Sequence, residues 1–282
     1  MPAASTVKKT KTTTTKAVAK KPAVAKPAVA KKSAAKARMT LAEAMRALED
    51  AGSAQTRKTY ARHGAPEPMF GVSFAVLKTL HKRIGVDHEL ACALWDTGNF
   101  DARNLAVKIV DPSRMSSADL DRWTREMSTS RMCGGYAAML AAEGPHGPAK
   151  ANEWLAAEDA PIRAAGWTLL GQLAQRDETL PDAWFHDRLA TIERTIHTAP
   201  NSERGGMNLA LITIGCRNPA LRKAATAAAK RIGKVDVDHG DTACKTPDAA
   251  SYIDKTWEHS LAKGFASPAA HERTRDSPRT RC

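Results

Sequence analysis

The chain has few aromatic residues and, over its first 38 positions, no acidic residue at all. Phe, Trp and Tyr make up 5% of the 282 residues, and residues 1–38 hold ten Lys and one Arg but no Asp or Glu. Removing these eleven charges from the net charge of +13 leaves +2 on the other 244 residues. The excess positive charge is therefore confined to the N-terminal segment, and the rest of the chain is close to neutral.

Long apolar runs and a regular cysteine pattern are also missing. No run approaches the roughly 18 apolar residues that cross a bilayer. The five cysteines are odd in number and widely scattered, which argues against a framework of disulfides. We therefore expect a soluble, intracellular protein.

The N-terminal segment, residues 1–38, is rich in Lys, Ala, Pro and Thr. It has too little apolar surface to offset the entropy of folding, so we predict a disordered tail. Spaced lysines suit a polyphosphate, and the composition resembles that of histone H1-like tails. A solubilising linker is the alternative, whereas Pro22 and Pro27 argue against the amphipathic helix of an organellar presequence. The lysines from which we expect phosphate contacts are Lys8, Lys9, Lys11, Lys20, Lys21, Lys31 and Lys32.

A helical pattern runs from Met39 to about Leu261, interrupted by frequent stop signals. Thr40 and Glu43 have the spacing of a capping box, and Gly52 marks the end of the helix that they begin. An alternating pattern typical of a strand occurs only at 235–238, which is too short to build a sheet. Further helices are predicted over 53–64, 73–84, 88–97, 101–110, 117–127, 161–175, 182–197, 202–215 and 218–232.

Short helices joined by short loops predict an all-α fold. Such helices bury their apolar faces by stacking in pairs, so we expect a curved α-solenoid of HEAT-like antiparallel helix pairs. A compact helical bundle is the alternative. The expected organisation is a disordered basic tail over 1–38, a helical-repeat domain over 39–263, and a short flexible basic end over 264–282. This basic end carries Arg273, Arg275, Arg279 and Arg281.

Several phrases between Thr40 and Leu261 are similar, in order and spacing, to the AlkD-like DNA alkylation-repair family of HEAT-like-repeat glycosylases. They are Tyr60-Ala61-Arg62-His63-Gly64, Phe70-Gly71-Val72, Asp87-His88-Glu89-Leu90-Ala91, Leu94-Trp95-Asp96-Thr97-Gly98-Asn99, Ala102-Arg103, Ile109-Val110-Asp111-Pro112, Ala164-Ala165-Gly166-Trp167 and Ile232-Gly233-Lys234-Val235.

The resemblance implies a concave basic surface that binds double-stranded DNA carrying alkylated or distorted sites. Studied members of the family hydrolyse the N-glycosidic bond of cationic N3- and N7-alkylpurines without flipping the base. A carboxylate near the deoxyribose stabilises the developing positive charge. The resemblance further implies a monomer without cofactor or metal, located in the cytoplasm in association with the nucleoid.

The family's catalytic aspartate belongs to a Trp-Asp-x-x-Asp motif at the start of a helix. The matching stretch runs from Ser128 to Tyr136, with Ser130 in place of the Trp and Gly134 in place of the last Asp. No carboxylate or aromatic residue occurs between Ser128 and Gly135; Glu126 and Glu143 lie outside the stretch. Two hypotheses follow: excision by a different group, or binding of damaged or branched DNA without cleavage. A protein–protein scaffold is a third.

The resemblance also assigns DNA contacts. Arg163 matches the family's DNA-contacting arginine, and Asn208 stands where the family has a Trp against the DNA backbone. Arg103, Arg131 and Arg204 fall in separate helices or at their starts, where they could follow a phosphate backbone. Scattered surface arginines are the alternative interpretation. Trp123, which has two arginines close by in the sequence, is the tryptophan that we expect to be exposed.

A polar cluster follows the last long helix of the series. It comprises Asp236, Asp238, His239, Asp241 and Cys244. The spacing matches neither an EF-hand nor a paired Cys/His site, so we expect no metal and instead a loop held by Asx turns around Gly240. Lys245, which a glycosylase-lyase could use as an amine, is interpreted as a loop residue.

Overall fold

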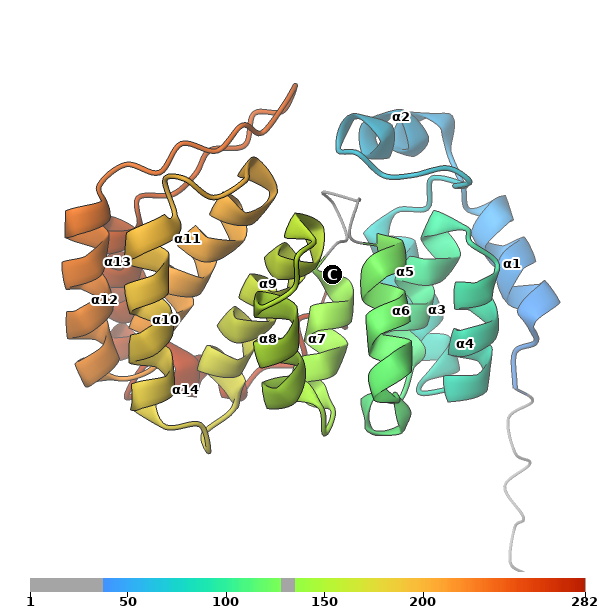
Figure 1. The fold of residues 1–282 in the computed structure, drawn as a ribbon. Coiled ribbons are helices and arrows are strands. Elements are labelled where there is room, and N and C mark those ends of the chain that lie inside the picture. The colour runs from blue at the N-terminus through green and yellow to red at the C-terminus, as the bar shows by residue number, and fades with distance from the viewer. Residues whose placement is uncertain (1–37, 128–134, 282) are drawn as a thin grey trace, which may run out of the picture. The chain divides into compact units, whose positions relative to one another are not determined.

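The computed structural model describes residues 38–127 and 135–281, which belong to one folded unit. Residues 1–37, with the seven lysines named above, and Arg131 lie outside the described residues. Within the described ranges every regular element is helical (Figure 1). The helices are α1 Leu41–Asp50, α2 Ala54–Arg62, α3 Phe74–Ile84, α4 His88–Asp96, α5 Phe100–Ile109, η1 Pro112–Arg114, α6 Ser117–Met127, α7 Tyr136–Glu143, α8 Gly147–Leu155, α9 Ala160–Arg176, α10 Asp182–Thr195, α11 Asn201–Gly215, α12 Pro219–Ile232, α13 Ala249–Ala262 and α14 Pro268–Arg273.

Polar side chains begin many of these helices. Thr40 and Glu43 form the predicted capping box at the start of α1, with Thr40 N donating to Glu43 Oε2 over 2.8 Å. Ser53 caps α2, Asp87 caps α4 and Asn218 caps α12. Each cap satisfies an amide that the first turn leaves without a partner. The capping pattern read from the sequence is therefore confirmed.

The helices stack in two rows that together form an α-solenoid of antiparallel pairs, as predicted. We call α5, α7, α9, α11 and α13 the odd row, and α4, α6, α8, α10 and α12 the even row. Each odd-row helix packs on its even-row neighbour and on the next helix of its own row. The odd-row helices begin at the upper edge of Figure 1, where the even-row helices end. We call this edge the N-terminal edge.

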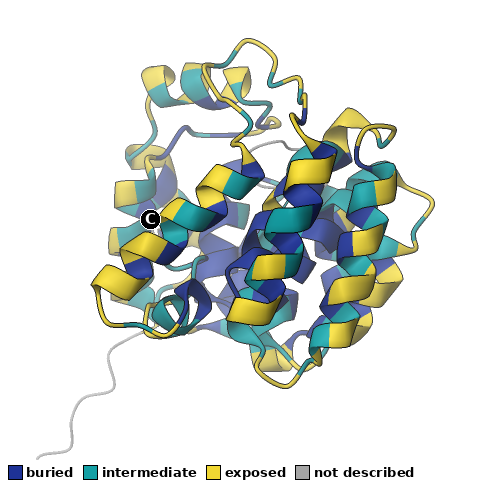
Figure 2. Ribbon diagram, turned by 90° about the vertical axis from the view of Figure 1, so that its left-hand side faces the viewer, coloured by how far each residue is buried: buried dark blue, intermediate teal, exposed yellow. Residues whose placement is uncertain are grey.

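The buried residues, marked in dark blue on the ribbon of Figure 2, come from helices of both rows. They form two clusters that meet at α9, because Leu169 and Leu173 belong to one and Trp167 and Leu170 to the other. Gly166 allows α9 to approach α8 closely, since a Cβ there would lie 2.9 Å from Leu155 N. The longest helix thus connects both halves of the core.

Helices α7, α8 and α13 were not among the predicted segments. Residues 136–143 read Tyr-Ala-Ala-Met-Leu-Ala-Ala-Glu, so the helix is apolar on nearly every face and shows little amphipathic periodicity. Its burial within the odd row explains that pattern.

The end of the chain is folded rather than flexible, so that prediction is wrong for the residues described. Helix α14 packs on α9 and α13, and we call residues 274–281 the C-terminal strap. The strap continues from α14 to α7 and α5, where Arg279 is 8% exposed. The Nε of Arg279 pairs with Glu143 Oε2 over 2.7 Å, and the Nη1 of Arg279 donates to the carbonyl of Val107. Tertiary partners therefore order a segment that composition alone marked as disordered.

Candidate nucleic-acid interface

Arg163 lies in the first turn of α9, at the N-terminal edge. Its Nε and Nη2 donate to Glu203 Oε1 over 2.9 and 2.6 Å, and its Nη1 donates to the carbonyls of Ala157 and Glu158. The bonds to Glu203, which is buried in the first turn of α11, raise the pKa of the Arg163 guanidinium. Arg163 is thus first a brace between two helix starts, and its side chain is 25% exposed.

Arg204 and Asn208, both on α11, hold the loop of residues 233–248. Arg204 donates to the carbonyls of Ala199 and Asp236, each over 2.9 Å. Asn208 Nδ2 donates to Pro247 O over 3.0 Å, and the residue is only 2% exposed. We expected Asn208 to contact DNA at the position of the family's Trp, but its side chain is buried beneath the loop.

Trp123 is fully buried, so the expectation that it is exposed is wrong. Its ring stacks on Trp95 with 3.9 Å between centroids and 2° between planes. Arg103 lies over the other partner of this stack, 5.0 Å from the Trp95 ring, and pairs with Glu126 Oε2 over 2.9 Å. The charges near Trp123 in the sequence indicated exposure, but α6 turns the indole into the core.

The two carboxylates that flank the family's catalytic position are both engaged. Glu126 Oε2 accepts from Trp95 Nε1 over 2.5 Å as well as from Arg103. Glu143 pairs with Arg279 and also accepts the hydroxyl of Ser277. The sequence holds no other Asp or Glu between them. Both carboxylates are thus held in ion pairs with arginines.

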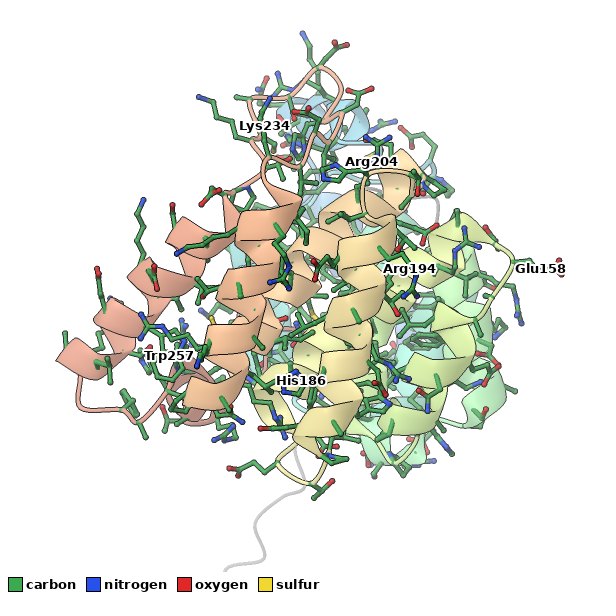
Figure 3. All side chains as sticks on the ribbon, turned by 60° about the vertical axis from the view of Figure 1, so that its left-hand side comes forward. Glu158, His186, Arg194, Arg204, Lys234 and Trp257 are labelled. Carbon is green, nitrogen blue, oxygen red and sulfur yellow. The ribbon has the colours of Figure 1, made fainter. Side chains whose placement is uncertain are left out.

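A hollow of about 280 Å³ opens at the N-terminal edge, lined by the start of α11, the 233–248 loop and His63 at the end of α2. Asn201 and Ser202 line it from the first turn of α11, which has no side-chain cap. Uncapped amides at a helix start favour an anion. Asp238 and His239 of the loop also line the hollow, and His239 makes a 3.0 Å hydrogen bond with Thr246. In Figure 3, the labelled residues Arg204 and Lys234 lie toward this edge, whereas Trp257 lies away from it.

Helix α2 adds positive charge beside this hollow. Its nine residues include Arg57, Lys58 and Arg62 and no acidic residue. Arg57 pairs with Glu67, whereas Lys58 and Arg62 are exposed. The sequence predicted this helix but not its place among the candidate phosphate-binding groups. The pattern that could have indicated it is three basic residues and no acidic residue within nine positions.

Buried Asp101 holds residues 70–72, which follow α2 in the chain. Its carboxylate accepts from the amides of Phe70, Gly71 and Val72 at 2.6, 3.0 and 2.9 Å. Tyr60 of α2 donates its hydroxyl to the carbonyl of Val72 over 2.8 Å. The basic helix is therefore tied to the start of α5 rather than hinged freely.

The polar cluster at 236–244 forms a tied loop. Gly240 N donates to Asp238 Oδ1 over 2.8 Å, which confirms the predicted Asx turn. In the described ranges no three His, Cys, Asp or Glu side chains converge as metal ligands would. Over the same ranges, no helix combines the length and apolarity that crossing a membrane requires.

Comparisons with known proteins agree with this architecture. Two uncharacterized proteins, Lmo0209 of Listeria monocytogenes and Lin0241 of Listeria innocua, are each 30% identical over 218 residues, covering 75% of this chain and 93% of theirs. A solved structure with 31% identity and a TM-score of 0.71 covers 81% of this chain and 96% of its own. It represents a family of proteins related to the HEAT-like repeat DNA glycosylases, with affinity for branched DNA structures. The family model for DNA alkylation repair enzymes matches residues 41–253, so this chain belongs to that family.

Proposed function

We propose that this protein binds branched or distorted DNA at its N-terminal edge and does not hydrolyse the glycosidic bond. The observation that carries the proposal is the state of Glu126 and Glu143. Both are paired with arginines, and no carboxylate lies between them in the sequence. In the family that this chain resembles, a carboxylate near the deoxyribose stabilises the developing sugar cation, and both flanking carboxylates here already pair with an arginine.

The N-terminal edge has the chemistry for phosphate groups. The uncapped start of α11 and the exposed Lys58 and Arg62 of α2 border one hollow or lie beside it. Branched DNA presents phosphates from strands that diverge, which suits anion sites on separate elements. The affinity of the 31%-identical neighbour for branched DNA supports the same choice.

The test measures binding of the full chain to a four-way junction and to a duplex of the same length and sequence, both at 0.1 M salt. We expect about tenfold tighter binding to the junction. The double variant Lys58→Gln/Arg62→Gln should weaken junction binding about tenfold, because neither side chain can then neutralise a phosphate. Lys223→Gln/Lys263→Gln, with two exposed lysines away from this edge, is the matched control. Equal losses of affinity in both pairs would show that charge, not location, governs binding.

Base excision is the second candidate, because the family includes repair enzymes. Duplexes carrying N7-methylguanine or N3-methyladenine are incubated with the same protein. We expect base release no faster than spontaneous depurination. Faster release that Arg163→Ala abolishes would refute the non-hydrolytic proposal and indicate a relocated catalytic group.

A further inference from the structure

A second pocket lies away from the N-terminal edge hollow, where the C-terminal strap meets α3, α5 and α7. Its volume is about 210 Å³. Phe74 and Tyr136 supply aromatic walls, and Lys108, Arg279 and Arg281 supply positive charge. Among the residues that the structure describes, no Asp or Glu lines it. Nothing in the proposed DNA contact uses these side chains.

The basic side chains of this pocket are held in place rather than loosely exposed. Lys108 is 4% exposed, and its Nζ donates to Arg279 O over 2.8 Å while lying 5.8 Å from the Phe74 ring centroid. Arg279 donates through Nε and Nη1 to Glu143, Val107 and Lys108. Among the described residues, its Nη2 has no hydrogen-bond partner. A preorganised site of this kind binds a ligand with little further ordering.

Among the described residues around the pocket, Lys108 and four arginines outnumber three acidic residues, Glu143, Glu272 and Asp276. Four arginines share two glutamates: Arg279 pairs with Glu143, and Glu272 accepts from Arg176, Arg275 and Arg281. Burial, followed by the charges of Lys108 and Arg279, lowers the pKa of His81. The electrostatic environment therefore favours an anion, while the aromatic walls favour a planar group.

We propose that this pocket binds a nucleotide, with the base against Phe74 and Tyr136 and the phosphate at Lys108, Arg279 and Arg281. Aromatic faces bind bases with little sequence preference, and basic side chains bind the phosphate. This site goes beyond the proposed DNA-binding edge and does not depend on it. An unpaired nucleotide of a DNA strand and a free nucleotide present the same chemistry.

The test uses calorimetry on the full chain with three probes: deoxyadenosine monophosphate, deoxyadenosine and inorganic phosphate. We expect the monophosphate to bind at least tenfold more tightly than either part alone. Phe74→Leu should weaken the monophosphate about tenfold and leave phosphate unchanged. Arg281→Gln should weaken both, and Arg281→Lys should retain most of the phosphate affinity. The control is Arg273→Gln, because Arg273 lies on α14 outside the pocket and pairs with Glu178.

Each result decides the proposal. Equal affinity for the monophosphate and for phosphate would show that the base does not contribute to binding. Equal affinity for the monophosphate and for deoxyadenosine would show that the phosphate does not contribute. Binding that none of the pocket variants changes would place the nucleotide elsewhere, and absent binding would overturn the site. Variants are compared only after thermal unfolding shows a folded protein. Junction binding, measured on the same variants, reports separately on the proposed function.

Discussion

At the scale of single residues, the same side chain can serve structure and function, and Arg163 shows how. An arginine in the first turn of a helix opposes the helix dipole. In this chain Glu203 and two loop carbonyls compensate it. The position matches the family's DNA-contacting arginine, yet most of its donors are used within the protein. A loss of DNA binding on mutation therefore has to be separated from a loss of stability.

Arg163→Ala should lower the free energy of unfolding by about 2–3 kcal/mol, because it leaves buried Glu203 without its charge partner. The double variant Arg163→Ala/Glu203→Leu should recover part of that stability, since the uncompensated charge is then gone. Urea unfolding of the parent, both single variants and the double variant gives the coupling energy. Additive effects of the two substitutions would contradict the brace.

At the scale of elements, arginines of the C-terminal region cap helices to which they are not adjacent in sequence. Arg279 donates to carbonyls in the last turn of α5, and Arg273 donates to Gln175 O in the last turn of α9. These carbonyls have no partner within their own helices, and the helix ends carry partial negative charge. Helix α14 and the C-terminal strap therefore stabilise the ends of odd-row helices, α9 and α5 respectively.

Arg279→Ala should destabilise the protein by about 3 kcal/mol, because it removes a buried charge pair and leaves two carbonyls without a donor. Arg275→Ala is the matched control, since Arg275 is exposed and its pair with Glu272 is screened by solvent. We expect the control to change stability by no more than about 0.5 kcal/mol. The midpoint of urea unfolding measures both; equal midpoints for the two variants would show that the strap contributes little.

At the scale of the whole molecule, charge is divided unequally along the sequence. Residues 1–38 carry eleven of the positive charges, whereas the rest of the chain is nearly neutral. Any attraction of the folded unit to an anion therefore depends on where its charged side chains lie, as on α2, and not on a large net charge. Because long-range attraction to a polyanion follows net charge, we expect it to come mainly from the N-terminal segment.

Deleting residues 1–37 should weaken binding to unbranched duplex more than binding to a four-way junction. Every phosphate that the protein no longer neutralises reduces the slope of log K against log salt by about 0.9, so the slope should fall by several units. Anisotropy titrations between 50 and 200 mM salt measure it. An unchanged slope would exclude the segment as a DNA-binding tail.

The sequence alone determined the all-helical class, most of the helix starts and the resemblance to the family. Caps such as Thr40 and stops such as Gly85 act through neighbouring residues, so their effects can be read locally. The exposure and pairing of the candidate DNA contacts could not be predicted in this way, because both depend on distant parts of the chain. Trp123 is a case in point, because its stacking partner lies on α4.

Only the tertiary structure decided which charged groups are already paired. Arg163 meets Glu203 across 40 residues, and Arg279 meets the carbonyl of Val107 across 172. Burial makes such pairing necessary, because a charge removed from water requires a partner. The helices followed from interactions within a few residues, whereas the free and engaged groups of the site followed from how those helices pack.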